Sequence, residues 1–172
     1  MATKKPVWVL FGILVISAWV LGSAIQAGAE TMKCRTATVA TTDERIPVGD
    51  AEGHELGLQI LRGLAFFENG EIAKLRVHSI FDVGPGGGQS INYMFYTFED
   101  GSTIVVRTPR LMVADKPGTF SAQMPGELIK GTGRFEGIKG TTSSTGKNFI
   151  HTKEEPTRIT NDITFTYTLP TK

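Results

Sequence analysis

Residues 130–140 read KGTGRFEGIKG, with glycines at positions 131, 133, 137 and 140 in a stretch otherwise typical of extended chain. Glycines this dense occur in phosphate-binding loops or where strands bend sharply. A phosphate loop lies between a strand and a helix, and the usual motif ends in Gly-Lys-Ser/Thr. No such tail is present, and TTSSTGKNF (141–149) is typical of strands and turns. We therefore interpret the glycines as bends in a strongly coiled sheet and expect a bent strand at 133–140.

Alternation of apolar and polar residues predicts strands elsewhere after Glu30. The segments DITFTYTL (162–169) and IAKLRVHSIF (72–81) each place apolar side chains on one face and polar ones on the other. INYMFYTF (91–98) and TIVVRT (103–108) flank Glu-Asp-Gly-Ser, and Asp-Gly between two such runs is a strong hairpin signal. No helical apolar stripe is found in this part of the chain.

The remaining segments complete a set of about eight short strands joined by glycine-rich turns. Further strands are expected at 34–40, 55–67, 118–123, 127–129 and 143–151, with a tight turn at 68–71 and a loop at 82–90. Many short antiparallel strands predict an all-β sandwich or barrel. Glycines within strands favour the barrel, because closing a small sheet requires strong coiling.

The glycine segment also carries a family resemblance. ELIKGTGRFEGIKGTTSSTGK (127–147) resembles the hallmark segment of the allene oxide cyclase and dirigent β-barrel superfamily, and RGLAFFENGEIAKLRVHSIF (62–81) and INYMFYTFEDGSTIVVR (91–107) precede it in the order of that barrel. The resemblance covers about residues 56–150. It implies an antiparallel eight-stranded barrel, often trimeric, with an apolar cavity that in plant members takes oxylipins or phenoxy radicals. The enzymes' Glu-containing and paired-Asp motifs have no clear counterpart, so no catalytic residue is carried over.

The first 29 residues have the order of a secretory signal: Lys4 and Lys5, an apolar run, and Ala27-Gly28-Ala29 before Glu30. We expect cleavage after Ala29 and a single barrel domain at 30–172. The alternative is an uncleaved hydrophobic helix, because the apolar run is nearly long enough to span a bilayer. In either case we expect export to the periplasm or the exterior, with or without a membrane anchor.

Charge and cysteine usage narrow the classes of partner. The net charge is +1, and loss of the two lysines with the leader would change it to −1, so nothing favours nucleic acid or an anionic membrane surface. Cys34 is the only cysteine and cannot form an intrachain disulfide. A buried thiol is the simplest interpretation, with an intermolecular disulfide or a reactive thiol as alternatives.

The strand at 91–98 carries aromatic and Met side chains on both faces. Such a strand is buried on both sides, between the lumen and a neighbouring subunit or a covering segment. The ligand-site hypothesis takes Tyr93 and Phe95 as apolar contacts, with Asn92 and Arg107 orienting the ligand. Ordinary core packing is the alternative.

Few other residues suggest chemistry. Arg107 and Arg110 bracket Pro109 and are candidates for binding a carboxylate, with solvated arginines at a strand end as the alternative.

The acidic and histidine residues give no metal signal. His54, His78 and His151 form no closely spaced pair, so no metal site is expected. Glu52, His54 and Glu55 are the densest ionisable cluster, either a general acid or base at a barrel mouth or a solvated loop.

Together these patterns predict an exported barrel that binds a small apolar or amphipathic molecule in its lumen without a cofactor, and the family resemblance implies a homotrimer as one form of assembly. One alternative is a cyclase or isomerase that acts by confinement. Another is a structural subunit held in a membrane complex by residues 1–29.

Overall fold

The computed structural model describes residues 28–116, 119–149 and 155–171, and the predicted signal or anchor lies almost entirely outside them. In chain order the elements are β1 (Glu30–Pro47), β2 (Glu55–Phe67), β3 (Ile72–Gly84), β4 (Gly87–Thr97), β5 (Thr103–Lys116), β6 (Thr119–Gln123), β7 (Gly126–Thr132), the 3₁₀ turn η1 (Gly133–Phe135), β8 (Lys139–Phe149) and β9 (Arg158–Thr168). Within these ranges no helix has the length and apolar character needed to cross a membrane.

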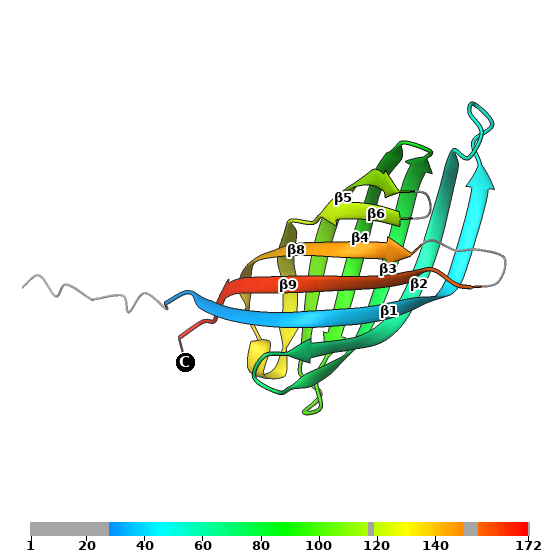
Figure 1. Cartoon of the computed structure of the whole chain (residues 1–172). Helices are drawn as coiled ribbons and strands as arrows, with labels where there is room; N and C mark the ends of the chain where they lie inside the picture. Colours follow the sequence, from blue (N-terminus) through cyan, green and yellow to red (C-terminus); the bar gives the residue numbers. More distant parts are fainter. Residues whose placement is uncertain (1–27, 117–118, 150–154, 172) are drawn as a thin grey trace, which may run out of the picture.

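All strands are antiparallel and form one closed sheet (Figure 1). The order is β4-β3-β2-β1-β9-β8-β6-β5-β7, and pairing of β4 with β5 closes it. β6 and β7 both pair with β5 and β8, β6 near the C-terminal end of β5 and β7 near its N-terminal end. They therefore share one position, and the nine strands make an eight-position barrel. The predicted all-β eight-stranded barrel is confirmed.

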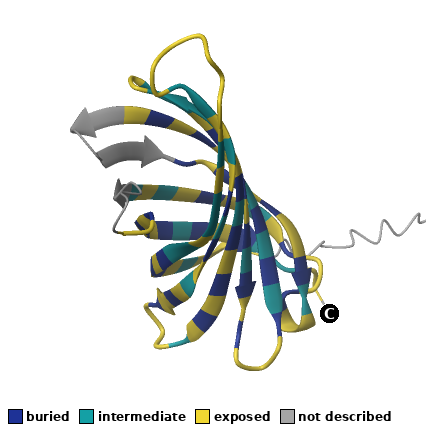
Figure 2. Cartoon of the chain, turned by 90° about the vertical axis from the view of Figure 1, so that its right-hand side faces the viewer, coloured by how far each residue is buried: buried dark blue, intermediate teal, exposed yellow. Residues whose placement is uncertain are grey.

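Alternation along the strands divides the side chains between the lumen and the outer wall, as the burial colours in Figure 2 show. Along β4 and the residue after it, the lumen side carries Phe98, Tyr96 and Met94, followed by Asn92 and Ser90. The lumen thus changes from apolar to polar along the strand. The buried polar side chains on the other strands include Thr36, Thr38, Gln59, Ser79, Thr108, Thr142 and Asn161.

The apolar end of the lumen is a solid core. Ring contacts with centroids 5.0–6.4 Å apart link five aromatic side chains in one cluster: Phe67, Tyr96, Phe98, Phe135 and Phe165. Tyr96 and Phe165 have no exposed surface. These rings fill the closed end of the lumen.

The glycine segment closes that end, and here the prediction of a bent strand at 133–140 is wrong. The chain turns through η1 and re-enters the sheet only at β8, on the side of the β2–β3 hairpin in Figure 1. Gly133 and Gly137 have φ of 63° and 74°, which side chains with a Cβ rarely adopt. The turn inserts Phe135, 4% exposed, beneath the barrel.

Arg134 seals the closed end from outside. Its guanidinium lies 4.7 and 4.8 Å from the ring centroids of Phe98 and Phe135. It also pairs with Glu71 at 2.6 Å and Asp100 at 3.4 Å. The segment that resembles the dirigent hallmark is thus a structural plug.

The predicted loop at 82–90 is also wrong. β3 and β4 continue to Gly84 and Gly87, which face each other in a tight hairpin. A Cβ on Gly88 would lie 2.1 Å from the backbone oxygen of Asp82, so close approach of two strands explains that glycine.

Cys34 lies in the core, in agreement with the buried-thiol interpretation. Burial, aided by the charge of Asp162, raises the pKa of its thiol to about 12. The thiol is therefore protonated at physiological pH and a poor nucleophile.

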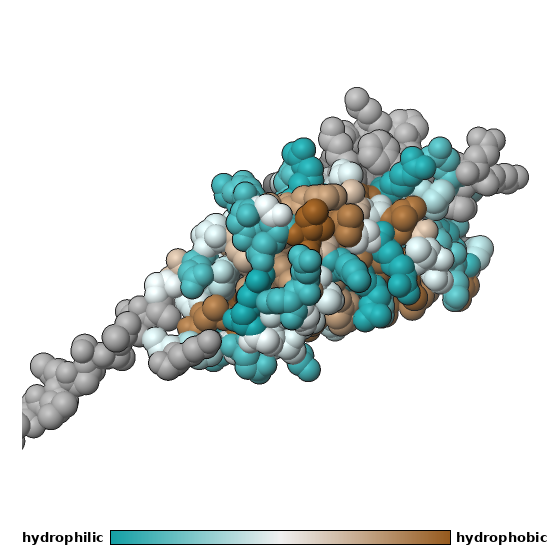
Figure 3. Space-filling view, turned by 90° about the horizontal axis from the view of Figure 1, so that it is seen from below, coloured by the Kyte–Doolittle hydropathy of each residue, from teal (hydrophilic) through white to brown (hydrophobic). Residues whose placement is uncertain are grey.

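The outer wall carries exposed apolar side chains, and on the face drawn in Figure 3 hydrophobic residues lie in separate patches among hydrophilic ones. Leu58, Ile80, Ile91 and Pro109 are successive cross-strand partners from β2 to β5. Ile80 is 66% exposed. The predicted homotrimer remains a prediction.

Candidate functional site

A cavity of about 590 Å³ lies at the open end of the barrel, opposite η1. This is the size of a pocket for a small organic molecule. Its lining combines apolar, polar and charged side chains, including Phe81, Val83, Met112, Gln59, Ser79, Ser90, Arg45, Glu55, Arg110 and Thr157, with Glu52, Gly53 and Pro85 contributed by its turns.

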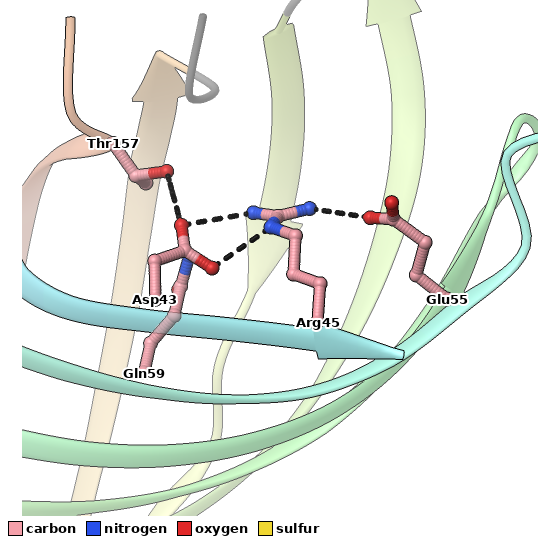
Figure 4. A network of polar contacts seen from close by, with 5 residues as sticks. All are labelled: Asp43, Arg45, Glu55, Gln59 and Thr157. Carbon is pink, nitrogen blue, oxygen red and sulfur yellow. Dashed lines mark hydrogen bonds and ion pairs between the residues drawn. The ribbon is translucent and has the colours of Figure 1, made fainter. Parts of the chain in front are cut away.

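A β-bulge in β1 directs two charged residues to the lumen. Opposite β2, Ala40 pairs with Leu61 but Thr42 pairs with Ile60, so Thr41 is an extra residue. One extra residue reverses which face the following side chains occupy. Asp43 and Arg45 consequently lie on the lumen side (Figure 4).

Arg45 is fully compensated by acidic neighbours. Its Nε and Nη2 donate to Asp43 at 2.8 and 3.1 Å, and its Nη1 donates to Glu55 at 2.8 Å. Its guanidinium lies 5.1 Å from the Phe81 ring centroid. Burial works to lower the pKa of Arg45, but the hydrogen bonds to Asp43 and Glu55 outweigh it and the pKa is raised.

Asp43 is the centre of this network. Besides Arg45, it accepts hydrogen bonds from Gln59 at 2.7 Å and Thr157 at 3.4 Å (Figure 4). The group ties β1 and β2 to the start of β9. Its charges are satisfied within the chain, which indicates a structural role.

Arg110 is in a different situation. It is 7% exposed, and its Nε and Nη2 have no hydrogen-bond partner among the described residues. Burial lowers the pKa of Arg110 to about 10, so the side chain remains charged at neutral pH. An isolated buried charge costs several kcal/mol. Arg110 is therefore the candidate functional residue in the lining of the cavity.

The four residues of the ligand-site hypothesis fall on two different faces. Asn92 lies in the lumen, 6% exposed, and donates to Ser90 at 3.4 Å. Tyr93, Phe95 and Arg107 lie on the outer wall, because they alternate with the lumen residues. Asn92 is thus the only member that the barrel places inside.

Phe95 has a partner on the outer wall. The Arg76 guanidinium lies 5.0 Å from its ring centroid, and the His78 ring lies at 5.3 Å. This is surface packing.

In the ionisable cluster near the β1–β2 loop, His54 lies between Asp50 and Asp82, and we call these three residues the His54 clamp. His54 Nδ1 lies 2.6 Å from Asp50 Oδ1, and its Nε2 lies 2.8 Å from Asp82 Oδ1. The hydrogen bonds to Asp82 and Asp50 raise the pKa of His54. Glu52 is exposed, and Glu55 is bonded to Arg45 instead of His54.

Two further observations limit the alternatives. No group of three or more potential metal ligands occurs among the residues whose positions are described. A larger hollow of about 900 Å³ lies along β1, β8 and β9, but its charged side chains pair with each other, Arg35 with Asp162 and Lys33 with Glu68. His151 lies outside the described ranges.

Comparisons with known proteins bear on the fold. No family model and no curated protein sequence matches the chain. The solved structure of the pterocarpan synthase dirigent protein GePTS1 is similar, at 13% identity and a TM-score of 0.50, over 84% of this chain and 93% of that one. That of the pterocarpan synthase dirigent protein PsPTS1 gives 11% identity and a TM-score of 0.44, over 83% and 97%. The likeness to GePTS1 shows that the chain has the barrel fold of a dirigent protein, as the resemblance of residues 127–147 predicted.

Proposed function

We infer that the barrel binds a small apolar or amphipathic molecule in the cavity at its open end. The observation that carries this proposal is a lumen with two different halves, one filled by aromatic rings and the other hollow. Filling the whole lumen would give a more stable protein, so a cavity kept beside buried polar groups indicates a ligand.

The chemistry of the lining supports the amphipathic class. Phe81, Val83 and Met112 offer an apolar surface, while Ser79 and Ser90 lie within the same cavity. Apolar walls with a few convergent polar groups are typical of small-molecule sites. The comparison proteins are dirigent proteins by name, which is consistent with a barrel that holds a small molecule.

The test is binding of Nile red, a neutral apolar dye, measured by fluorescence. Met112→Trp places a large side chain in the cavity and should reduce binding by about tenfold or more, because the volume available falls. Val113→Trp is the matched control, since Val113 is the next residue on β5 and is 58% exposed. Equal binding by both variants would place the dye elsewhere and reject the lumen site.

Export remains part of the proposal and rests on the order of residues 1–29. Intact-mass measurement of the protein from soluble and membrane fractions tests it. A chain that begins at Glu30 supports a secreted or periplasmic binding barrel. A full-length chain found only in membranes with other subunits would favour the structural-subunit alternative.

A further inference from the structure

We propose that the ligand is a monocarboxylate with an apolar body, and that Arg110 binds its carboxylate. This rests on the proposed lumen function and specifies the chemical class of the ligand. The argument depends on which atoms of Arg110 lack partners, on how the other arginines of this chain use the same atoms, and on the charges around the cavity.

The unpartnered atoms of Arg110 are Nε and Nη2, which form one edge of the guanidinium. Arg45 uses this same edge to hold Asp43, at 2.8 and 3.1 Å. Arg35 uses it to hold Asp162, at 2.7 and 3.3 Å. Two parallel N–H donors match the two oxygens of a carboxylate. Arg110 thus offers the same two donors as Arg45 and Arg35, but it has no carboxylate partner among the described residues and it lies beside a cavity.

No acidic residue compensates Arg110 in the described part of the chain. Burial is the only cause that lowers its pKa, and no carboxylate acts against it. Ser90, its partner across β4 and β5, is uncharged. A ligand carboxylate would supply the missing charge in a region of low dielectric, where a charge-assisted pair is strong.

The remaining lining restricts the rest of the ligand. Phe81 and Met112 are buried beside Arg110 and favour an apolar body. Glu52 also lines the cavity, and its charge disfavours a second negative charge on the ligand, whereas the charge of Glu55 is compensated by Arg45. A monocarboxylate is therefore favoured over a phosphate ester or a dicarboxylate.

Binding requires a small movement of Arg110. Solvent does not reach Nε or Nη2 in the structure, so the guanidinium must turn that edge toward the cavity. Rotation about its terminal torsions accomplishes this without moving the backbone of β5.

The experiment is displacement of Nile red by decanoate and by 1-decanol, which share one chain and differ in the head group. The wild-type chain should bind decanoate about 10- to 100-fold more tightly, which corresponds to a hydrogen-bonded charge pair. Arg110→Met should abolish this preference and leave decanol affinity unchanged or improved. Arg110→Lys should retain only part of it, because the fork is lost.

Arg107→Met is the matched control, because Arg107 lies on the outer wall of the same strand. It should retain the full preference. Equal binding of decanoate and decanol by the wild type, or an unchanged preference in Arg110→Met, would overturn the carboxylate inference while leaving lumen binding intact. Failure of Nile red to respond to Met112→Trp would instead overturn the lumen site and the inference with it.

Discussion

Arg45 and Arg110 line the same cavity but have opposite surroundings. Arg45 is bonded to Asp43 and Glu55, whereas Arg110 has two buried nitrogens without a partner among the described residues. The pKa of Arg45 is raised by its hydrogen bonds, and the pKa of Arg110 is lowered by burial. The same side chain thus serves the fold in one place and is available to a ligand in the other.

The difference teaches how a functional charge can be recognised in a barrel. A buried ion pair is weak evidence for function, because its members satisfy each other. A buried charge without a partner is destabilising and persists only where something else favours it. Stability and binding should consequently respond in opposite ways at the two arginines.

The largest effect is expected from Asp43→Ala. It leaves Arg45 with Glu55 alone and removes the acceptor of Gln59. The free energy of unfolding should fall by roughly 2–4 kcal/mol, slightly less than for a fully buried pair. Urea denaturation measures it.

Asp162→Ala provides the control, because its pair with Arg35 is exposed to solvent and should contribute little to the free energy of unfolding. Equal losses of unfolding free energy in Asp43→Ala and Asp162→Ala would show that the lumen network stabilises the fold no more than an exposed ion pair does.

Arg110→Met should change the free energy of unfolding in the opposite direction. It removes an uncompensated buried charge and keeps most of the side-chain volume, so the free energy of unfolding should rise by about 1–3 kcal/mol. The same urea measurement applies. A loss of stability similar to that of Asp43→Ala would mean that Arg110 is already compensated, and the contrast with Arg45 would fail.

Ser90→Asp should give Arg110 an internal carboxylate partner, as Asp43 gives to Arg45. Ser90 is directly opposite Arg110 on β4, so an aspartate there can reach the free edge of the guanidinium. Stability should rise by up to about 1 kcal/mol, and the preference for decanoate should disappear because the internal carboxylate occupies Arg110. Ser90→Asn is the control, because asparagine has nearly the size of aspartate but no charge. It should keep the preference for decanoate over decanol.

Alternation and turn residues were enough to predict the strands and the barrel, because the lumen side chains recur with period two along 162–169 and 72–81. They could not predict that Asp43 and Arg45 face inward, because the bulge at Thr41 reverses the alternation without a glycine to mark it. The alternation of side chains along the strand did contain the information that Arg110 faces the lumen. Ile104 and Val106 face the lumen, so the residue at 110 must follow them, whereas Arg107 must face out.

The two glycine-rich segments were mispredicted for a different reason. Gly133 and Gly137 form the turn that closes the barrel, and the glycines at 84–88 form a close hairpin. Both are backbone requirements that composition cannot distinguish from a bent strand or a loop.

The smallest effect concerns the His54 clamp, which holds the β1–β2 loop against β3 with charges that solvent reaches. Hydrogen bonds to Asp82 and Asp50 raise the pKa of His54 above its ordinary 6.5. A raised pKa means that its contribution to stability is complete below about pH 6.5 and is lost as the pH rises through the folded-state pKa. The difference in unfolding free energy between the wild type and His54→Gln should therefore be largest in mildly acidic solution and shrink toward alkaline pH. Arg45 and Arg110 stay charged across this range, so their difference should not change with it. If the His54→Gln difference grew with pH, the histidine would be held in its neutral form, and the clamp would be an ordinary hydrogen bond without an ionic part.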